Sequence, residues 1–175
     1  MGIARDDGQL RKIKIHQENA MQWSEVLTSP YLKNLPFKIE LNQFGQVLMS
    51  PASNVHGAIQ ADVGHVFKSK LKRGTTFSEC SIQTRHGVKV ADVAWASDDF
   101  LARHGEVTPF PQSPELCVEI VSPSNTKREI EHKVSLYFAH GAQEVWVVNL
   151  KKQVSMYVGG LPAAKSKILP GFKGL

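Results

Sequence analysis

Apolar and polar positions alternate with two different periods along this chain, and each change of period marks a new element. Between residues 53 and 71 the apolar positions recur three to five residues apart, which predicts a long helix with one apolar face. A shorter helix is predicted at 18–27, before Thr28-Ser29-Pro30. Alternation at 37–41 and 46–49, around a turn containing Asn and Gly, predicts a β-hairpin between the two helices.

The second half of the chain has the pattern of a sheet with one crossover helix. Strands are predicted at 75–83, 88–95, 116–121, 144–150 and 153–158. The run at 116–121 is nearly continuously apolar, which is typical of a strand buried on both faces. Thr126-Lys127-Arg128-Glu129 fits a capping box, so a helix is predicted from there to about His140. Because this helix connects 116–121 to 144–150, those two strands are predicted to be parallel.

From residue 53 onward the order is helix, three strands, helix, strand. This order predicts an α/β fold, in which helices cover both faces of a mixed sheet, with an N-terminal helix and β-hairpin in front of it. We expect a polar N-terminal segment at 1–17, a single domain at 18–158 and a Gly/Pro-rich C-terminal tail at 159–175. Residues 97–114 read as a polar connection, and loops of such length are often functional.

Composition narrows the class of protein. No apolar run approaches the roughly 20 residues that cross a bilayer, and the N-terminus lacks an apolar leader, so we expect a cytoplasmic protein without a membrane partner. Cys80 and Cys117 lie in apolar strand-like segments and are expected to be reduced core residues. Sequence signatures of serine hydrolases, zinc proteases, P-loop proteins and dinucleotide-binding proteins are absent.

The positive charge permits a polyanionic partner without identifying one. The net charge is +5 and the pI is near 9.3. Part of this charge is clustered within six residues, at Lys68, Lys70, Lys72 and Arg73. The cluster fits either a solvated helix end or a contact with nucleic acid.

Asp92 and Glu119 carry the strongest indication of chemistry, because each lies in an apolar strand-like segment. A buried carboxylate is costly unless it is paired, hydrogen-bonded or bound to a metal. Two of them in strands that could be neighbours suggest a divalent-metal site. The alternatives are structural: Asp92 could accept hydrogen bonds from a loop, and Glu119 could pair with a basic residue on a helix.

Lys133 is the third candidate. It borders the apolar stripe of its predicted helix, three residues after Ile130 and four before Tyr137, so its amine could reach the strand that carries Glu119. Periodicity alone fits equally well an exposed pair with Glu129 at i,i+4.

These residues resemble the motifs of a known family. The segments are Ala91-Asp92-Val93, Val118-Glu119-Ile120-Val121-Ser122-Pro123-Ser124, Lys133-x-x-x-Tyr137 and Gly141-Ala142-Gln143-Glu144-Val145-Trp146. In this order they resemble the restriction endonuclease-like PD-(D/E)XK superfamily, and within it the Uma-type endonucleases, over roughly residues 37–158. The chain departs from the superfamily pattern at Ala91, which replaces Pro, and at Val121, which stands where the motif places its Lys.

The resemblance implies an αβββαβ core and a nuclease acting on DNA with Mg²⁺ or Mn²⁺. It implies that Asp92, Glu119 and the backbone carbonyl of Ile120 bind the metal, and that Lys133 supplies the amine in place of Val121. The accessory candidates are His56, Glu79 and Glu131, of which His56 could equally be a structural helix-end residue. A homodimer is expected, because cutting both strands of a duplex usually takes two active sites.

Two further functions remain open from the sequence. Val121 in the motif position fits a nucleic-acid-binding module that kept the nuclease fold without catalysis. The carboxylates could also be purely structural, in a scaffold or interaction protein.

Overall fold

The computed structural model describes residues 20–51, 53–123 and 125–175. Its helices are α2 (Trp23–Thr28), α3 (Asn54–Lys70), α4 (Asp98–His104) and α5 (Lys127–Ala139). Its strands are β1 (Phe37–Leu41), β2 (Val47–Pro51), β3 (Thr75–Thr84), β4 (Gly87–Ala96), β5 (Leu116–Ile120), β6 (Glu144–Val148), β7 (Val154–Val158) and β8 (Leu161–Ala163). The polar segment expected at 1–17 lies outside the described residues. None of the helices in the described part is long and apolar enough to span a membrane.

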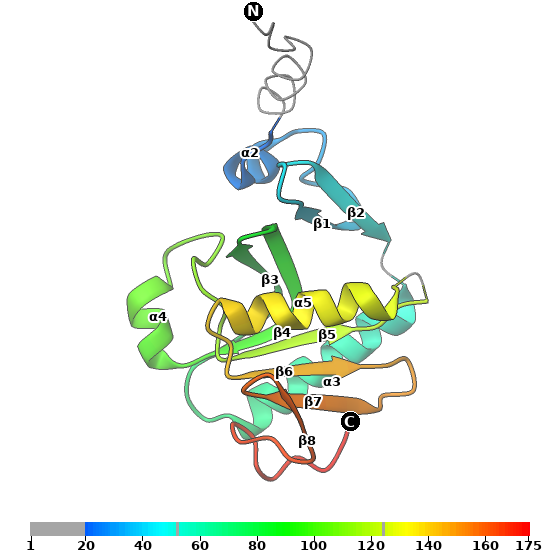
Figure 1. The fold of residues 1–175 in the computed structure, drawn as a ribbon, viewed down its shortest axis with the longest axis vertical. Helices are drawn as coiled ribbons and strands as arrows, with labels where there is room; N and C mark the ends of the chain where they lie inside the picture. Colours follow the sequence, from blue (N-terminus) through cyan, green and yellow to red (C-terminus); the bar gives the residue numbers. More distant parts are fainter. Residues whose placement is uncertain (1–19, 52, 124) are drawn as a thin grey trace, which may run out of the picture.

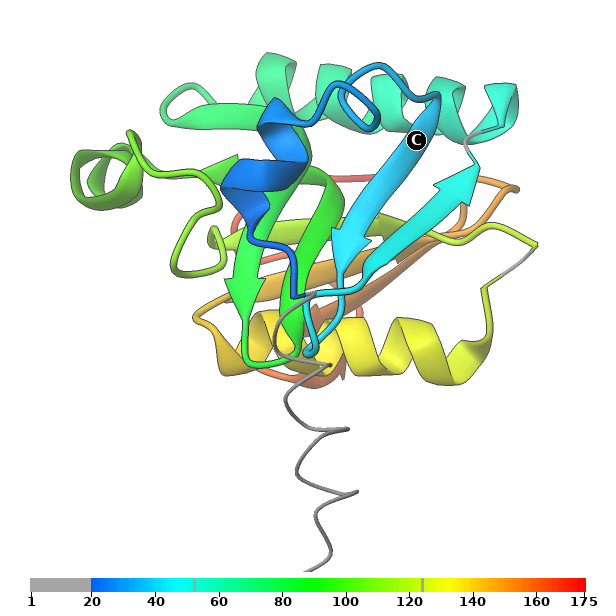
Figure 2. The same ribbon diagram turned by 90° about the horizontal axis from the view of Figure 1, so that it is seen from above.

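The larger sheet is mixed, as predicted. Its strand order is β3-β4-β5-β6-β7-β8, and β5 and β6 are parallel while the other neighbours are antiparallel. The helix α5 covers one face and α3 the other, so the αβββαβ order predicted from the sequence is confirmed (Figures 1 and 2).

The two helices pack on the sheet through the apolar stripes that the sequence pattern indicates. Ile59, Val63 and Phe67 of α3 are almost fully buried and join a cluster with Val118 and Trp146. The ring of Phe67 meets Trp146 edge to face, with centroids 5.3 Å apart. Burial of these large side chains fixes α3, and with it the residues at its N-terminal end, against the centre of the sheet.

Both cysteines are free and buried, as predicted. Burial raises the pKa of the Cys80 thiol to about 12, and burial likewise raises that of Cys117. These thiols therefore stay protonated and act as small apolar core residues.

Some boundaries differ from the sequence prediction. In the described residues the helix predicted at 18–27 begins at Trp23, where the Gln22 amide donates to the Glu25 carboxylate at 2.6 Å, and residues 18 and 19 lie outside the described part. The segment 97–114, predicted as a connection, contains α4, which starts at the N-cap Ser97 and is anchored by the buried Phe100. The expected tail at 159–175 includes β8, which pairs with β7, and the buried Leu169.

The hairpin β1-β2 forms a separate two-stranded sheet that lies across one end of β4 (Figure 2). Lys89 of β4 donates to the carbonyl of Leu41 at 3.1 Å, and the Val90 amide donates to the Glu40 carboxylate at 2.8 Å. This docking places Lys38 and Glu40 of β1 beside β4, next to the point at which the pairing of β4 with β5 ends.

Candidate active site

The site forms where β4 loses its regular pairing on both sides. The ladder between β4 and β5 stops at Val93–Val118, one pair before Asp92 would meet Glu119. The ladder between β3 and β4 is interrupted at the same level, because Glu79, opposite Asp92, has a φ of 53° and makes no strand pair. The carbonyl of Asp92 accepts from the Gln60 amide at 2.7 Å instead. Asp92 therefore has no strand partner on either side, although it lies within β4.

Asp92 is buried and bonded on both carboxylate oxygens. Its Oδ2 accepts from the Ile120 amide at 2.6 Å and lies 3.3 Å from His56 Nε2, while its Oδ1 accepts from Lys38 Nζ at 2.7 Å. Burial alone would raise its pKa, but the charge of Lys38 and these hydrogen bonds hold the pKa of Asp92 well below its ordinary value. The carboxylate is therefore ionised.

Glu119 lies beside Asp92 and is also buried. Its Oε1 accepts from the Tyr137 hydroxyl at 2.5 Å, and its Oε2 lies 3.2 Å from Lys133 Nζ and 3.6 Å from Lys38 Nζ. Burial raises the pKa of Glu119, and the two ammonium groups offset part of that rise. The spacing Lys133-x-x-x-Tyr137 puts both partners on the same face of α5, which is why one helix supplies two contacts to one carboxylate.

Glu40 is a third carboxylate of the site that the sequence reasoning missed. Lys133 Nζ donates to its Oε1 at 2.7 Å, and the Val90 amide donates to the same atom. Burial opposes ionisation, but Lys133 and Lys38 outweigh it and lower the pKa of Glu40. The only signal in the sequence is the alternation Phe37-Lys38-Ile39-Glu40, which puts both charged residues on one face of the strand.

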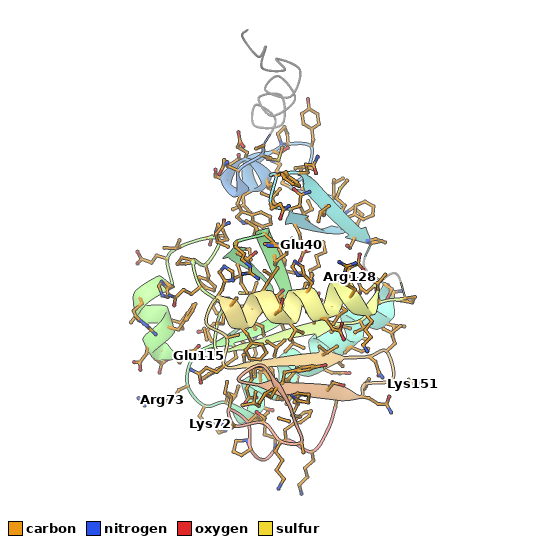
Figure 3. All side chains as sticks on the ribbon, viewed as in Figure 1. Glu40, Lys72, Arg73, Glu115, Arg128 and Lys151 are labelled. Carbon is orange, nitrogen blue, oxygen red and sulfur yellow. The ribbon has the colours of Figure 1, made fainter. Side chains whose placement is uncertain are left out.

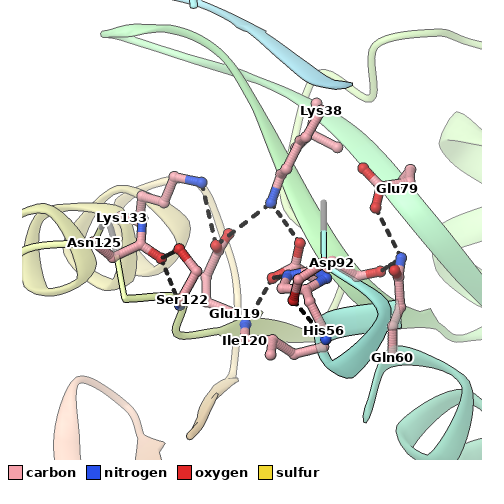
Figure 4. A network of polar contacts seen from close by, with 12 residues as sticks. Lys38, His56, Gln60, Glu79, Asp92, Glu119, Ile120, Ser122, Asn125 and Lys133 are labelled. Atoms are coloured by element: carbon pink, nitrogen blue, oxygen red, sulfur yellow. Dashed lines mark hydrogen bonds and ion pairs between the residues drawn. The ribbon is translucent and has the colours of Figure 1, made fainter. Parts of the chain in front are cut away.

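Figure 4 shows Asp92, Glu119 and the two lysines converging, and these residues line a cleft of about 420 Å³. Six of its lining residues carry titratable side chains: Lys38, His56, Glu79, Asp92, Glu119 and Lys133. The structure therefore brings Asp92, Glu119 and Lys133 together, and adds Lys38 from a strand that the sequence reasoning had not connected to the site.

The accessory candidates divide into two groups. His56 is in the cleft, and its hydrogen bond to Asp92 raises the pKa of the imidazole. Glu79 lines the cleft and accepts from Gln60 at 2.8 Å. Glu131 is not in the cleft; it is exposed, lies 3.6 Å from Lys127 and lines a separate hollow outside α5.

The basic cluster is not part of this cleft either. Lys68 lines a neighbouring groove along α3, which shares Glu79 with the cleft. Lys72 and Arg73 lie well apart from Glu40 of the site (Figure 3), and Arg73 pairs with the exposed Asp98 at 3.6 Å. The structure thus does not bring these two residues to the carboxylates.

The donor atoms of the site are oxygens, which suit hard divalent cations. Among the described residues, no three or more His, Cys, Asp and Glu side chains are arranged as a metal site. Mg²⁺ does not require such a set, because it usually keeps several waters and binds through one or two carboxylates. Asp92 and Glu119 meet that smaller requirement.

Known proteins resemble the chain in sequence pattern and in fold. The model of the Uma2 family, described as "Putative restriction endonuclease", matches residues 23–162. No curated protein matches. A solved structure titled "putative nuclease belonging to DUF820", from Anabaena variabilis ATCC 29413, has a TM-score of 0.60 at 20% identity and covers 78% of this chain and 74% of its own. At that identity the likeness concerns the fold.

Proposed function

We propose that this chain, which belongs to the Uma2 family, is a divalent-metal-dependent nuclease that hydrolyses phosphodiester bonds of DNA. The observation that carries the proposal is the convergence of Asp92 and Glu119 with two lysines at the break in the sheet. Buried carboxylates beside amines, in a cleft open to solvent, suit the binding of a cation and of a phosphate next to it.

Asp92, Glu119 and the carbonyl of Ile120 are the residues that would hold Mg²⁺ or Mn²⁺. The Ile120 amide points to Asp92, and the N–H and C=O of one strand residue face the same edge, so its carbonyl faces the same gap. When bound, the cation supplies Lewis-acid polarisation of the phosphodiester and a water of lowered pKa.

Lys133 is the amine that we assign to stabilising negative charge as the phosphodiester is attacked. Val121, in the position of the superfamily lysine, packs against the apolar cluster on the α5 side and offers no such group. Lys133 lies within 3.2 Å of Glu119, so the helix supplies the amine that the strand lacks.

The test is cleavage of supercoiled plasmid with Mg²⁺ or Mn²⁺. We expect Asp92→Asn and Glu119→Gln each to lower the cleavage rate by about 100-fold or more, since each removes a charge at the reacting centre. Asp62→Asn is the matched control, because Asp62 is a half-buried carboxylate paired with Lys152 and does not line the cleft. Circular dichroism establishes that each variant is folded. Equal rates in all four proteins would remove this site from the reaction.

A nucleic-acid-binding module is the second candidate, and Val121 is the observation that favours it. Titration of labelled DNA separates the two functions. Binding that weakens steeply with salt, without cleavage in either metal, would identify the module.

A further inference from the structure

One cation already bridges the two carboxylates assigned to metal binding. The Lys38 ammonium lies 2.7 Å from Asp92 Oδ1 and 3.6 Å from Glu119 Oε2, between the two groups (Figure 4). Its side chain is only 14% exposed. It comes from β1 of the hairpin, whereas both carboxylates belong to the large sheet.

We infer that Lys38 is a resident counter-ion of the metal site: it neutralises Asp92 and Glu119 when no metal is bound, and it must leave them for a divalent cation to bind. This inference rests on the proposed function, because it takes these two carboxylates as the metal ligands. It makes Lys38 the residue that sets how tightly the metal is held.

The hydrogen-bond pattern makes the competition direct. Asp92 Oδ2 is occupied by the Ile120 amide and His56, and Glu119 Oε1 is occupied by Tyr137. The two other oxygens, Asp92 Oδ1 and Glu119 Oε2, face a shared cation, and Glu119 Oε2 also accepts from Lys133 at 3.2 Å. These two oxygens lie 2.7 and 3.6 Å from Lys38 Nζ, so an incoming cation meets the ammonium at its own ligands.

The burial of Asp92 and Glu119 explains why the site needs a counter-ion. Two carboxylates at this depth would otherwise repel each other and lose their hydration. The positive charge of the Lys38 side chain offsets this repulsion and the lost hydration. A divalent cation and the ammonium cannot share the two oxygens, because their like charges repel at such short separations.

Lys133 provides the contrast within the same site. It also approaches Glu119 Oε2, at 3.2 Å, but its shorter contact is to Glu40, at 2.7 Å. Lys133 therefore keeps an anionic partner when the metal site fills. Replacing either lysine removes one positive charge beside Glu119, and only Lys38 also holds Asp92.

The test compares Mn²⁺ affinity in wild type, Lys38→Met and Lys133→Met by calorimetry. We expect Lys38→Met to bind Mn²⁺ about tenfold more tightly than wild type, a typical size for one coupled equilibrium. Lys133→Met is expected to raise the affinity by a smaller factor than Lys38→Met, because Lys133 does not contact Asp92 and is held by Glu40. Equal affinity of wild type and Lys38→Met, or an equal gain in both variants, would overturn the inference.

A second readout uses the wild type alone, in case Lys38→Met does not fold. The lysine side-chain NMR signals, assigned with Lys38→Arg and Lys133→Arg, are followed during titration with Mg²⁺. Displacement predicts a larger shift for Lys38 than for Lys133, and the reverse order would contradict it. If wild type and all variants bind no metal, the proposed function fails; if all bind alike, only the role of Lys38 fails.

Discussion

Within the site, each of three buried carboxylates lies beside at least one ammonium group. Asp92, Glu119 and Glu40 are buried carboxylates, and the ammonium groups of Lys38 and Lys133 each contact two of them. Removing one member leaves an uncompensated charge at low exposure, which costs several kcal/mol in general. Loss of activity in a site variant must therefore be measured together with its stability.

The backbone of Glu79 has a φ of 53°, in the left-handed region that disfavours a side chain. Glu79→Gly and Glu79→Ala both remove the hydrogen bond to Gln60, so the difference between them reports the backbone strain less the extra backbone entropy that Gly loses on folding. We expect the Gly variant to be more stable than the Ala variant by about 1 kcal/mol, measured by urea unfolding.

Ser78 is the control for that comparison, since it is paired with Val93 in the regular part of the ladder. There the order is expected to reverse, with Ala more stable than Gly by about 0.5–1 kcal/mol, because Gly loses more backbone entropy in a strand. If the Ala variant is the more stable one at both positions, the backbone of Glu79 is not strained.

The sequence allows Asp92 and Glu119 to be singled out because a carboxylate in an apolar strand stands out against its neighbours. Lys133 could be placed only through its position beside the apolar stripe. Lys38 and Glu40 could not be placed, since their strand is amphipathic and its pattern does not say which surface it covers. Their role depends on how the hairpin docks, which is tertiary information.

At the scale of elements, α5 joins the fold to the chemistry. Thr126 accepts from the Glu129 amide at 3.2 Å, and the Glu129 carboxylate accepts from the Thr126 amide at 2.7 Å, which completes the predicted capping box. Glu129 is thus used at the cap, while Lys133 turns toward Glu40 and Glu119. The exposed pair of Glu129 with Lys133, left open by periodicity, is not the contact that forms.

Thr126→Ala removes one side-chain acceptor at the start of α5 and should lower the free energy of unfolding by about 1 kcal/mol.

The backbone hydrogen bond from Thr126 lowers the pKa of Glu129. The contribution of the Glu129 carboxylate to stability is therefore complete above its unfolded-state pKa, and it is lost as the pH falls through its folded-state pKa.

Urea unfolding of wild type and Glu129→Gln across acidic pH measures this dependence. The stability difference between the two proteins should shrink as the pH falls, because the wild-type carboxylate becomes neutral like the amide. A difference that stays constant down to the lowest pH would show that the ionised carboxylate does not contribute through the cap.

Most elements of the described part were predictable, including the short strands β1, β5 and β7, whereas α4 and β8 were not. The helix predicted at 53–71 and the strands predicted at 75–83 and 88–95 agree with α3, β3 and β4 within one or two residues. The helix α4 was missed because Phe100 and Leu101 are its only large apolar residues, too few to establish a helical period.

On the scale of the whole molecule, a buried carboxylate adds to the strand pairing and apolar packing that hold the C-terminal segment to the sheet. Glu144 at the start of β6 is fully buried, and it accepts from Trp146 Nε1 at 3.2 Å and from the Ser166 hydroxyl at 2.6 Å. The backbone amides of Lys167 and Ile168 donate to its other oxygen. The Gly-x-x-Glu-x-Trp segment thus joins the middle of the sheet to the end of the chain.

Glu144→Ala should release that end, because it leaves several donors buried without an acceptor. We expect the free energy of unfolding to fall by about 3 kcal/mol. Relative to wild type, the rate of hydrogen exchange should rise more at residues 161–175 than in the helices α3 and α5. The exposed Glu106 provides the control Glu106→Ala, which should change neither quantity. If exchange rises equally throughout Glu144→Ala, the carboxylate stabilises the whole fold rather than anchoring its C-terminal segment.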